Sequence, residues 1–537
     1  MEKFTRITKM ILTSFILLLV LTGSALAQET IKGRITDSET GKPIEGVDVR
    51  FVGSKEEVSS EADGSFTIER IGDTYTLVFS HPDYDQQRIN SRGIEGDLIV
   101  ELITNVRLNQ YGQKVTRKVL SAESREGFIA FQSADRNFKF WFDNRIYLDG
   151  ASYFDNYDKN ITPDENLALG QLDVPSQFLK LRRMRFAIKA RVGDNWYGEI
   201  DFDFDGMLVD IKDVYIRRFF GTPGNPWGQI RIGQFRMPQG MQQTTTSRYL
   251  KLMERASLKE FNPNRRLGIG WASWNLKYMF ALGLHTEETR NALDYKEGDP
   301  DPNYYKGELQ GATPMLGLST RAAYYFFNDP GKLLSLSAGY SRRTPGLYKY
   351  PDNRIKYDPK DETYVSELEF TVVKVGGVKT ANNINVDLAA SYGPLRITGE
   401  YHYNLLAMKD VAGSVNFSGF YVQSAFLLTG ESHPWNHREG EFTQVRANKK
   451  SGAWEIVARY SYINLNDFEH GVRGGQKGQY TAGLNYYVSR NVKFMLNYSF
   501  VDHDHYSDGA GDFADYVQVP GTGFDYSFVT WRCEIDF

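Results

Sequence analysis

Between residues 137 and 537 the chain alternates apolar and polar side chains in one short stretch after another. In the stretch 137–149, aromatic and aliphatic residues share one face of an extended chain, and charged residues share the other. The stretches 195–205 and 529–537 repeat this pattern. A transmembrane strand needs about 9–11 residues with one face toward lipid and the other toward a polar lumen. The pattern therefore predicts the strands of a transmembrane β-barrel.

The number and spacing of these stretches predict the size of the barrel. Two or three turn residues join some of them, whereas long polar stretches such as 285–315 and 502–523 separate others. Tight turns that alternate with long loops are typical of outer-membrane barrels. We predict an all-β fold with a transmembrane antiparallel β-barrel of 16 strands, or 18 if the weakest stretches, 267–274 and 442–449, both count. The other predicted strands are 178–192, 210–220, 227–235, 276–284, 316–327, 333–342, 365–373, 383–393, 395–404, 417–428, 453–463, 479–489 and 491–501.

The N-terminal part of the chain carries different signals. A basic start, an apolar run and the small residues Ala25 and Ala27 predict a signal peptide over residues 1–27. Residues 28–104 contain short alternating segments broken by Gly, Pro and Asp turns, which predict a small β-sandwich. The polar stretch 105–136 is predicted to be a linker with a short helix near 121–126. The barrel domain is then 137–537.

Composition excludes several classes of protein. Cys533 is the single cysteine, so an intramolecular disulfide cannot form. The sequence contains no G-x-S-x-G motif, and its one tight histidine cluster, His503-Asp504-His505, lies in a predicted loop. We therefore expect no enzyme activity, no cofactor and no metal site. The net charge of −4 and the lack of a basic tail predict no nucleic-acid partner.

The stretch 178–192 is the strongest candidate for a solute pathway. Arg183, Arg185, Lys189 and Arg191 share one face of this strand, and apolar residues share the other, so the basic face should line the lumen. Arginine suits anions because its planar group presents fixed donors at constant charge, and rings of Arg or Lys line anion pores. An alternative stays open: acidic residues of the next strand, 199–205, could neutralise this face by cross-strand pairing.

A second basic group follows in a predicted long loop. Pro238 and Gly240 end one strand, and the spacing of apolar residues over 247–260 predicts a short helix. Such a loop is expected to fold into the lumen and narrow it. Alternatively, the helix packs on the wall and its acids, Glu254 and Glu260, pair with the cations. The basic residues that would face the constriction are Arg236, Arg248, Lys251, Arg255, Arg265 and Arg266.

Two sequence resemblances extend these predictions. The motifs GRITDSETGKPIEGVDVRF and EADGSFTIE resemble a carboxypeptidase-regulatory-like (transthyretin-like) domain. The run Leu181-Arg182-Arg183, the block IGQF-x-x-P-x-G at 232–240, the stretch 247–255 and Arg265-Arg266-Leu267-Gly268 resemble the phosphate-selective porin O and P family. This resemblance implies a 16-stranded, trimeric barrel in the outer membrane that passes small solutes, in some members anions such as phosphate. The N-terminal domain would lie in the periplasm.

We therefore predict a porin that passes small hydrophilic solutes by passive diffusion, with anions such as phosphate among them. The alternative is a plugged or energy-coupled outer-membrane transporter component, or an interaction protein. The N-terminal domain suggests energy coupling, but 105–136 is too short for a plug domain. The expected partners are outer-membrane lipid, small solutes or anions, further copies of the chain in a homotrimer, and a periplasmic partner of the N-terminal domain.

Overall fold

The structure is a computed structural model whose described residues form two compact units. The units are Met1–Val119 and Leu120–Phe537. The predicted signal peptide, residues 1–27, lies outside the described residues, as do most of the loop 285–315 and much of 502–523. The described residues are 30–70, 74–94, 96–108, 111, 113–116, 120–125, 128–154, 177–205, 209–222, 224–286, 317–345, 354–365, 370–409, 413–507 and 523–537.

The first unit contains two small sheets that pack around one core. One sheet orders β4 (Ser65–Glu69), β1 (Thr30–Asp37) and β7 (Leu98–Leu102). The other orders β3 (Glu57–Ser59), β2 (Asp48–Phe51), β5 (Thr76–His81) and β6 (Tyr84–Asn90). Phe66 and Phe79 meet edge to face in this core, with ring centroids 5.5 Å apart. The predicted sandwich of short strands is therefore present, and a hairpin of β8 (Val106–Leu108) and β9 (Lys114–Thr116) follows it.

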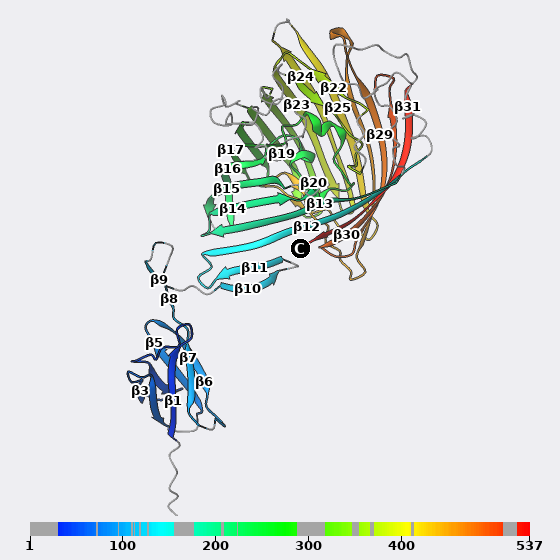
Figure 1. Cartoon of the computed structure of the whole chain (residues 1–537). Helices are drawn as coiled ribbons and strands as arrows, with labels where there is room; N and C mark the ends of the chain where they lie inside the picture. Colours follow the sequence, from blue (N-terminus) through cyan, green and yellow to red (C-terminus); the bar gives the residue numbers. More distant parts are fainter. Residues whose placement is uncertain are drawn as a thin grey trace, which may run out of the picture. The chain divides into compact units, whose positions relative to one another are not determined.

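A closed antiparallel barrel of 16 strands makes up most of the second unit (Figure 1). The barrel closes because β12 (Phe138–Tyr153) pairs with both β13 and the last strand, β31 (Phe524–Asp536). This confirms the prediction of 16 strands. The remaining strands are β13 (Gln177–Val192), β14 (Trp196–Asp203), β15 (Asp210–Thr222), β16 (Asn225–Arg236), β17 (Arg265–Trp274), β18 (Tyr278–His285), β19 (Gly317–Asp329), β20 (Lys332–Arg343), β23 (Val378–Tyr392), β24 (Leu395–Met408), β25 (Ser414–Leu427), β28 (Ala453–Asp467), β29 (Val472–Tyr487) and β30 (Val492–His503).

Two further strands extend the sheet outside the closed ring. β10 (Leu120–Arg125) pairs with β11 (Phe128–Ser133), and β11 pairs with the first residues of β12. The predicted helix near 121–126 is therefore wrong. The start of β12 lies beyond the reach of β31, whose register begins at Arg145, so its backbone groups pair with β11 instead.

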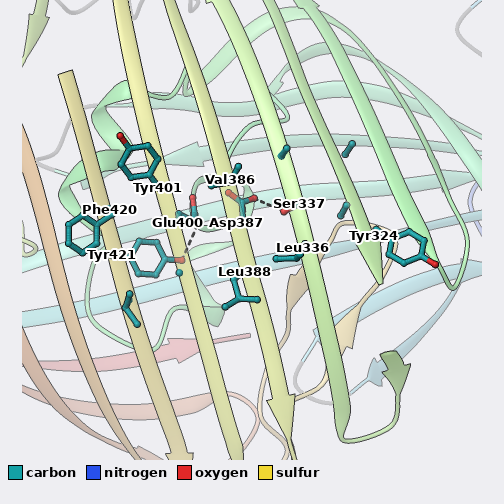
Figure 2. A pocket seen from close by; sticks show the side chains of 15 residues that line it. Tyr324, Leu336, Ser337, Val386, Asp387, Leu388, Glu400, Tyr401, Phe420 and Tyr421 are labelled. Atoms are coloured by element: carbon teal, nitrogen blue, oxygen red, sulfur yellow. Dashed lines mark hydrogen bonds between the residues drawn. The ribbon is translucent and has the colours of Figure 1, made fainter. Parts of the chain in front are cut away.

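The barrel strands have the two faces that the alternation of side chains predicts. In β31, Trp531 and Ile535 are about 40% exposed on the outside (41% and 39%), whereas Arg532 and Glu534 are each 1% exposed inside. Figure 2 shows the same division on β19 to β25, where Ser337 donates a hydrogen bond of 2.7 Å to Asp387 on the inner face. The outer side chains here surround an apolar hollow of about 750 Å³. This apolar exterior is what a lipid environment requires.

Three connections fold back instead of making barrel strands. The predicted strand 365–373 is not part of the barrel, because β22 (Val373–Val375) pairs only with β21 (Ile355–Tyr357). The predicted strand 442–449 is also wrong, since only β27 (Glu441–Phe442) forms there and pairs with β26 (Trp435–Asn436). The third connection, 237–264, contains α3 (Met241–Thr244) and two short 3-10 turns. Among the described residues, no helix is long and apolar enough to cross a membrane.

Candidate solute pathway

The three connections enter the barrel from both ends and contact its inner wall. The lumen loop (residues 237–264) and the lumen hairpin (residues 354–365 and 370–377) start from the end with the long loops. The strap (residues 428–452) starts from the end with the short turns, because β25 ends beside the turn 393–394. The lumen loop meets the strap where the Thr246 backbone N–H donates to Glu441 (3.1 Å). The lumen is therefore narrowed from both sides.

Side chains of the wall hold the backbone of the lumen loop. Arg532 Nη1 donates to the Met253 carbonyl (2.7 Å), and Asn485 Nδ2 donates to the Lys251 carbonyl (2.8 Å). Arg459 Nη1 donates to the carbonyl of Glu254 (3.0 Å). Because these donors satisfy carbonyls that a helix would pair internally, the loop need not be helical.

The predicted helix over 247–260 is therefore replaced by shorter turns. A 3-10 turn covers Ser247–Tyr249 and another covers Ser257–Phe261, with extended residues between them. Two predicted site residues serve this irregular backbone. Arg236 Nη1 donates to the Thr245 carbonyl (2.7 Å), and Arg255 Nε donates to the Gln242 carbonyl (2.7 Å).

Glu254 anchors the middle of the lumen loop to three wall arginines. Its carboxylate lies 2.8 Å from Arg182 Nε, 3.5 Å from Arg183 Nη2 and 3.1 Å from Arg532 Nη2. Arg532 also makes a two-pronged bond to Asp149, with both distances 2.7 Å. Arg183, a predicted pathway residue, thus lies at this buried anchor. The alternative considered from the sequence is therefore not the arrangement found, because Glu254 pairs with wall arginines and not with the cations of a loop helix.

A polar cavity of about 260 Å³ remains beside the lumen loop and strap. Its lining holds eight cationic side chains and six carboxylates. Five of the ten predicted basic residues line it, namely Arg185, Lys189, Arg236, Arg248 and Arg265. The other cations are Arg145, Arg217 and Arg231, and the carboxylates are Asp143, Glu199, Asp201, Asp213, Glu439 and Glu441.

Cross-strand ion pairs balance much of this lining. Arg185 Nε lies 2.8 Å from Asp203, and Arg265 Nη2 lies 2.7 Å from Asp213. Lys189 contacts both Asp143 and Glu199. Carboxylate oxygens of Glu199, Asp201 and Asp213 lie within 4.8 Å of one another, but the neighbouring cations compensate their charge. The neutralising pairs considered from the sequence are thus present for part of the basic face.

The remaining predicted residues lie away from the cavity lining. Arg191 is exposed, with its guanidinium carbon 5.9 Å from the centre of the Phe219 ring. Arg266 is half-buried and donates to the Arg265 carbonyl (2.9 Å). Arg183, Lys251 and Arg255 are buried at contacts of the lumen loop, where Lys251 Nζ lies 2.9 Å from Glu455.

Sequence reasoning missed three cations that line the cavity, Arg145, Arg217 and Arg231. Period-two alternation places Arg145 on the inner face of its strand, so this signal was present. Arg217 and Arg231 occupy directly opposite positions on β15 and β16. The stretch 210–220 carries charges of both signs and 227–235 carries only Arg231, so only the strand register shows that the two arginines meet.

Comparisons with known proteins find a matching family and related chains. A family described as phosphate-selective porin O and P matches residues 158–528, and a carboxypeptidase regulatory-like domain matches residues 30–109. Porin O of Pseudomonas aeruginosa is 22% identical over 412 residues, which cover 72% of this chain and 88% of the relative. An uncharacterized protein of Caulobacter vibrioides is 24% identical over 428 residues, with 75% and 76% coverage. The solved anion-selective porin from Comamonas acidovorans aligns at TM-score 0.43 and 12% identity, over 74% of this chain and all (100%) of that chain.

The family match and the barrel together decide what this protein is. The match spans more than half of the chain, and the 16 barrel strands close around a polar cavity. The resemblance inferred from the sequence motifs is thereby confirmed. The chain belongs to the phosphate-selective porin O and P family and forms a water-filled outer-membrane channel for the passive diffusion of small hydrophilic solutes.

Proposed function

We propose that this porin selects small anions, such as phosphate, over cations. The observation that carries the proposal is the cavity lining, in which eight cationic side chains face six carboxylates. An excess of cationic groups around a narrow polar passage raises the local concentration of anions. The predicted residues Arg185, Lys189, Arg236, Arg248 and Arg265 contribute to this excess, together with Arg145, Arg217 and Arg231.

Single-channel recording in planar bilayers tests the selectivity. With a gradient of KCl across the bilayer, the reversal potential of the wild-type pore is expected to favour chloride, and added phosphate is expected to reduce the chloride current. Arg217→Gln should weaken both effects because it removes a charge from the cavity. Lys379→Gln is the matched control, since it removes a charge from an exposed residue outside the cavity lining. A wild-type pore that favours neither ion would refute anion selectivity.

The same recording tests the alternative of a plugged barrel. The lumen loop, the lumen hairpin and the strap narrow the lumen, and this observation favours a restricted passage. Protein that is folded and inserted but gives no conductance steps would support the plugged barrel or an interaction role. Stable steps would support the open pore.

We infer that the N-terminal unit lies in the periplasm. The chain enters β12 at Phe138, which pairs with Val192 next to the short turn 193–195. Short turns of outer-membrane barrels face the periplasm, and long loops face outward. A protease added to intact cells should spare the N-terminal unit, and permeabilised cells should lose it. Cleavage in intact cells would place the unit outside.

We also propose a homotrimer, as membership of the family implies, with the signal peptide removed after residue 27. Light scattering of the detergent-solubilised protein measures the number of copies. Mass spectrometry of the purified chain measures its N-terminus. A monomer, or a mature chain that retains residues 1–27, would contradict the respective proposal.

A further inference from the structure

The strap departs from the rule for connections at its end of the barrel. Neighbouring strands there are joined by short turns such as 275–277, 330–331 and 393–394. The strap instead takes residues 428–452 to connect β25 with β28. A connection of this length with so little regular structure is uncommon unless it has a role of its own.

The strap reaches across the mouth of the barrel to the opposite wall. At its base, Val445 packs with Leu427, Ala453 and Tyr487 beside the strands that it connects. On the far side, Arg438 Nη2 donates to the Gly224 carbonyl in the turn between β15 and β16 (3.3 Å). The contacts therefore hold the strap at both ends.

The tip of the strap is held in place by a wall tyrosine and a wall arginine. Tyr325 donates through its hydroxyl to the His437 carbonyl (2.7 Å), and Arg321 Nη2 donates to the Gly440 carbonyl (3.1 Å). Gly440 has a positive φ of 62°. This left-handed backbone conformation strains an L side chain, and a Cβ atom at Gly440 would also lie 2.7 Å from Met279 Cε, so glycine is favoured there. The backbone on both sides of Glu439 is therefore fixed.

Glu439 contacts two arginines that lie next to each other on the wall. Arg217 and Arg231 are directly opposite across β15 and β16, where like charges repel. One oxygen of Glu439, Oε1, lies 3.3 Å from Arg217 Nη1 and 3.5 Å from Arg231 Nη2. No other ion pair of these two arginines is found among the described residues. Glu439 is thus the counter-anion of the arginine pair.

The Glu439 carboxylate remains accessible from the cavity. Its side chain is 38% exposed, whereas those of Arg217 and Arg231 are 14% and 15% exposed. All three line the cavity of about 260 Å³. An anion that enters this cavity therefore reaches the arginine pair on the side where Glu439 already binds. Carboxylates and phosphates use the same forked donors of arginine.

We propose that Arg217 and Arg231 form an oxyanion subsite that Glu439 occupies from within the chain, so that a permeating anion must displace this carboxylate. The inference rests on the proposed anion selectivity and assigns Glu439 as the residue that weakens anion binding. Weak binding benefits conduction, because a pore must release what it binds. Glu439 thus sets how strongly the subsite retains an anion.

Glu439→Gln tests the proposal, because glutamine keeps the shape of the side chain and removes its charge. Block of the chloride current by inorganic phosphate is measured in planar bilayers for the wild type and the variant. Charge-assisted hydrogen bonds are about twice as strong as neutral ones, so we expect the half-blocking concentration of phosphate to fall roughly tenfold. Glu469→Gln removes a carboxylate from an exposed turn outside the cavity and should leave the block unchanged.

Two further measurements distinguish competition between Glu439 and phosphate from a displacement of the strap. If Glu439→Gln merely released the strap, liposomes would become more permeable to neutral sugars; the proposal predicts unchanged sugar entry. In the double variant Glu439→Gln with Arg217→Gln, the tighter phosphate block should disappear. An unchanged half-blocking concentration in Glu439→Gln, or faster sugar entry, overturns the inference. A wild-type pore without anion preference refutes the proposed function instead, and the two failures are read from different measurements.

Discussion

Glu254→Gln is expected to release the lumen loop from the wall of the barrel. Glu254 binds Arg182, Arg183 and Arg532, and these contacts join the middle of the loop to strands β13 and β31. Glutamine has nearly the same shape but no charge, so the variant leaves three buried arginines without this partner. Arg532 keeps Asp149 and its hydrogen bond to the Met253 carbonyl, but its ion pair with the loop is lost.

The burial of the contacts that Glu254 makes with Arg182 and Arg532 determines how much free energy the substitution costs. The side chain of Glu254 is 2% exposed, and those of Arg182 and Arg532 are 9% and 1% exposed. Removing one member of a buried ion pair costs about 3–5 kcal/mol. Taking about 3 kcal/mol, the open population of the loop rises roughly hundredfold. Glu260→Gln on the same loop is the control, because Glu260 is 25% exposed and its one ion pair among the described residues is with Lys259, at 3.4 Å. Such a contact is worth about 0–1 kcal/mol.

Limited digestion with trypsin measures how often the loop opens. Lys251 and Arg255 lie buried within the lumen loop, so trypsin cuts there only in the open state. The folded Glu254→Gln protein should be cut at these sites much faster than the wild type, and its single-channel conductance should rise because the constriction loosens. Equal cutting rates and equal conductance in the two proteins would refute the anchoring role of Glu254.

Three other predictions concern the strap, the cavity and the N-terminal unit. Gly440→Val should displace the tip of the strap and speed the entry of sugars into liposomes, whereas Gly430→Val, which has positive φ but open space around it, should not. Lys189→Gln should shift the reversal potential toward cations, since it removes one cavity cation; an unmoved potential would contradict this. Backbone N–H bonds, chiefly from Thr40, lower the pKa of the Asp37 carboxyl. Its carboxylate therefore stabilises the domain above the unfolded pKa of about 3.9, and this stability is lost as pH falls through the lower folded value. Asp37→Asn should cost about 1–3 kcal/mol at neutral pH and progressively less at acidic pH; hydrogen exchange of the full chain measures this, and a pH-independent difference would contradict it.

The barrel strands were predictable because their signal is local. Successive side chains of a strand point to opposite faces, and lipid outside and water inside impose opposite demands on them. The last strand shows this directly, with Trp531 and Ile535 outside and Arg532 inside. The predicted strand 442–449 was wrong, because alternation alone does not show that a segment lies between lipid and water. Alternation in that stretch reflects a segment packed in the lumen, such as Phe442 and Val445, and not a strand between lipid and water.

The candidate pathway was predictable only in part. Alternation correctly placed Arg185 and Lys189 on the inner face, but it could not tell a residue of the cavity from one of the loop anchor, such as Arg183. Helical spacing in the lumen loop wrongly predicted a helix, because wall side chains donate hydrogen bonds to the backbone carbonyls of the loop. Arg217 and Arg231 were not predicted as a pair, because only the register of β15 against β16 brings them together.

The class of this protein can be read from its chain, because the period of the side chains specifies strands with a lipid face and a water face, and the motifs identify the family. Which charges meet, in contrast, depends on the three-dimensional fold. Arg532 binds Asp149 across 383 residues of sequence, and Arg217 binds Glu439 across 222. Such contacts depend on barrel closure, on strand register and on the inward path of three connections. Coulomb attraction acts through space over a few ångströms. The fold therefore sets the partner of each charge, and the periodicity of the sequence does not reveal it.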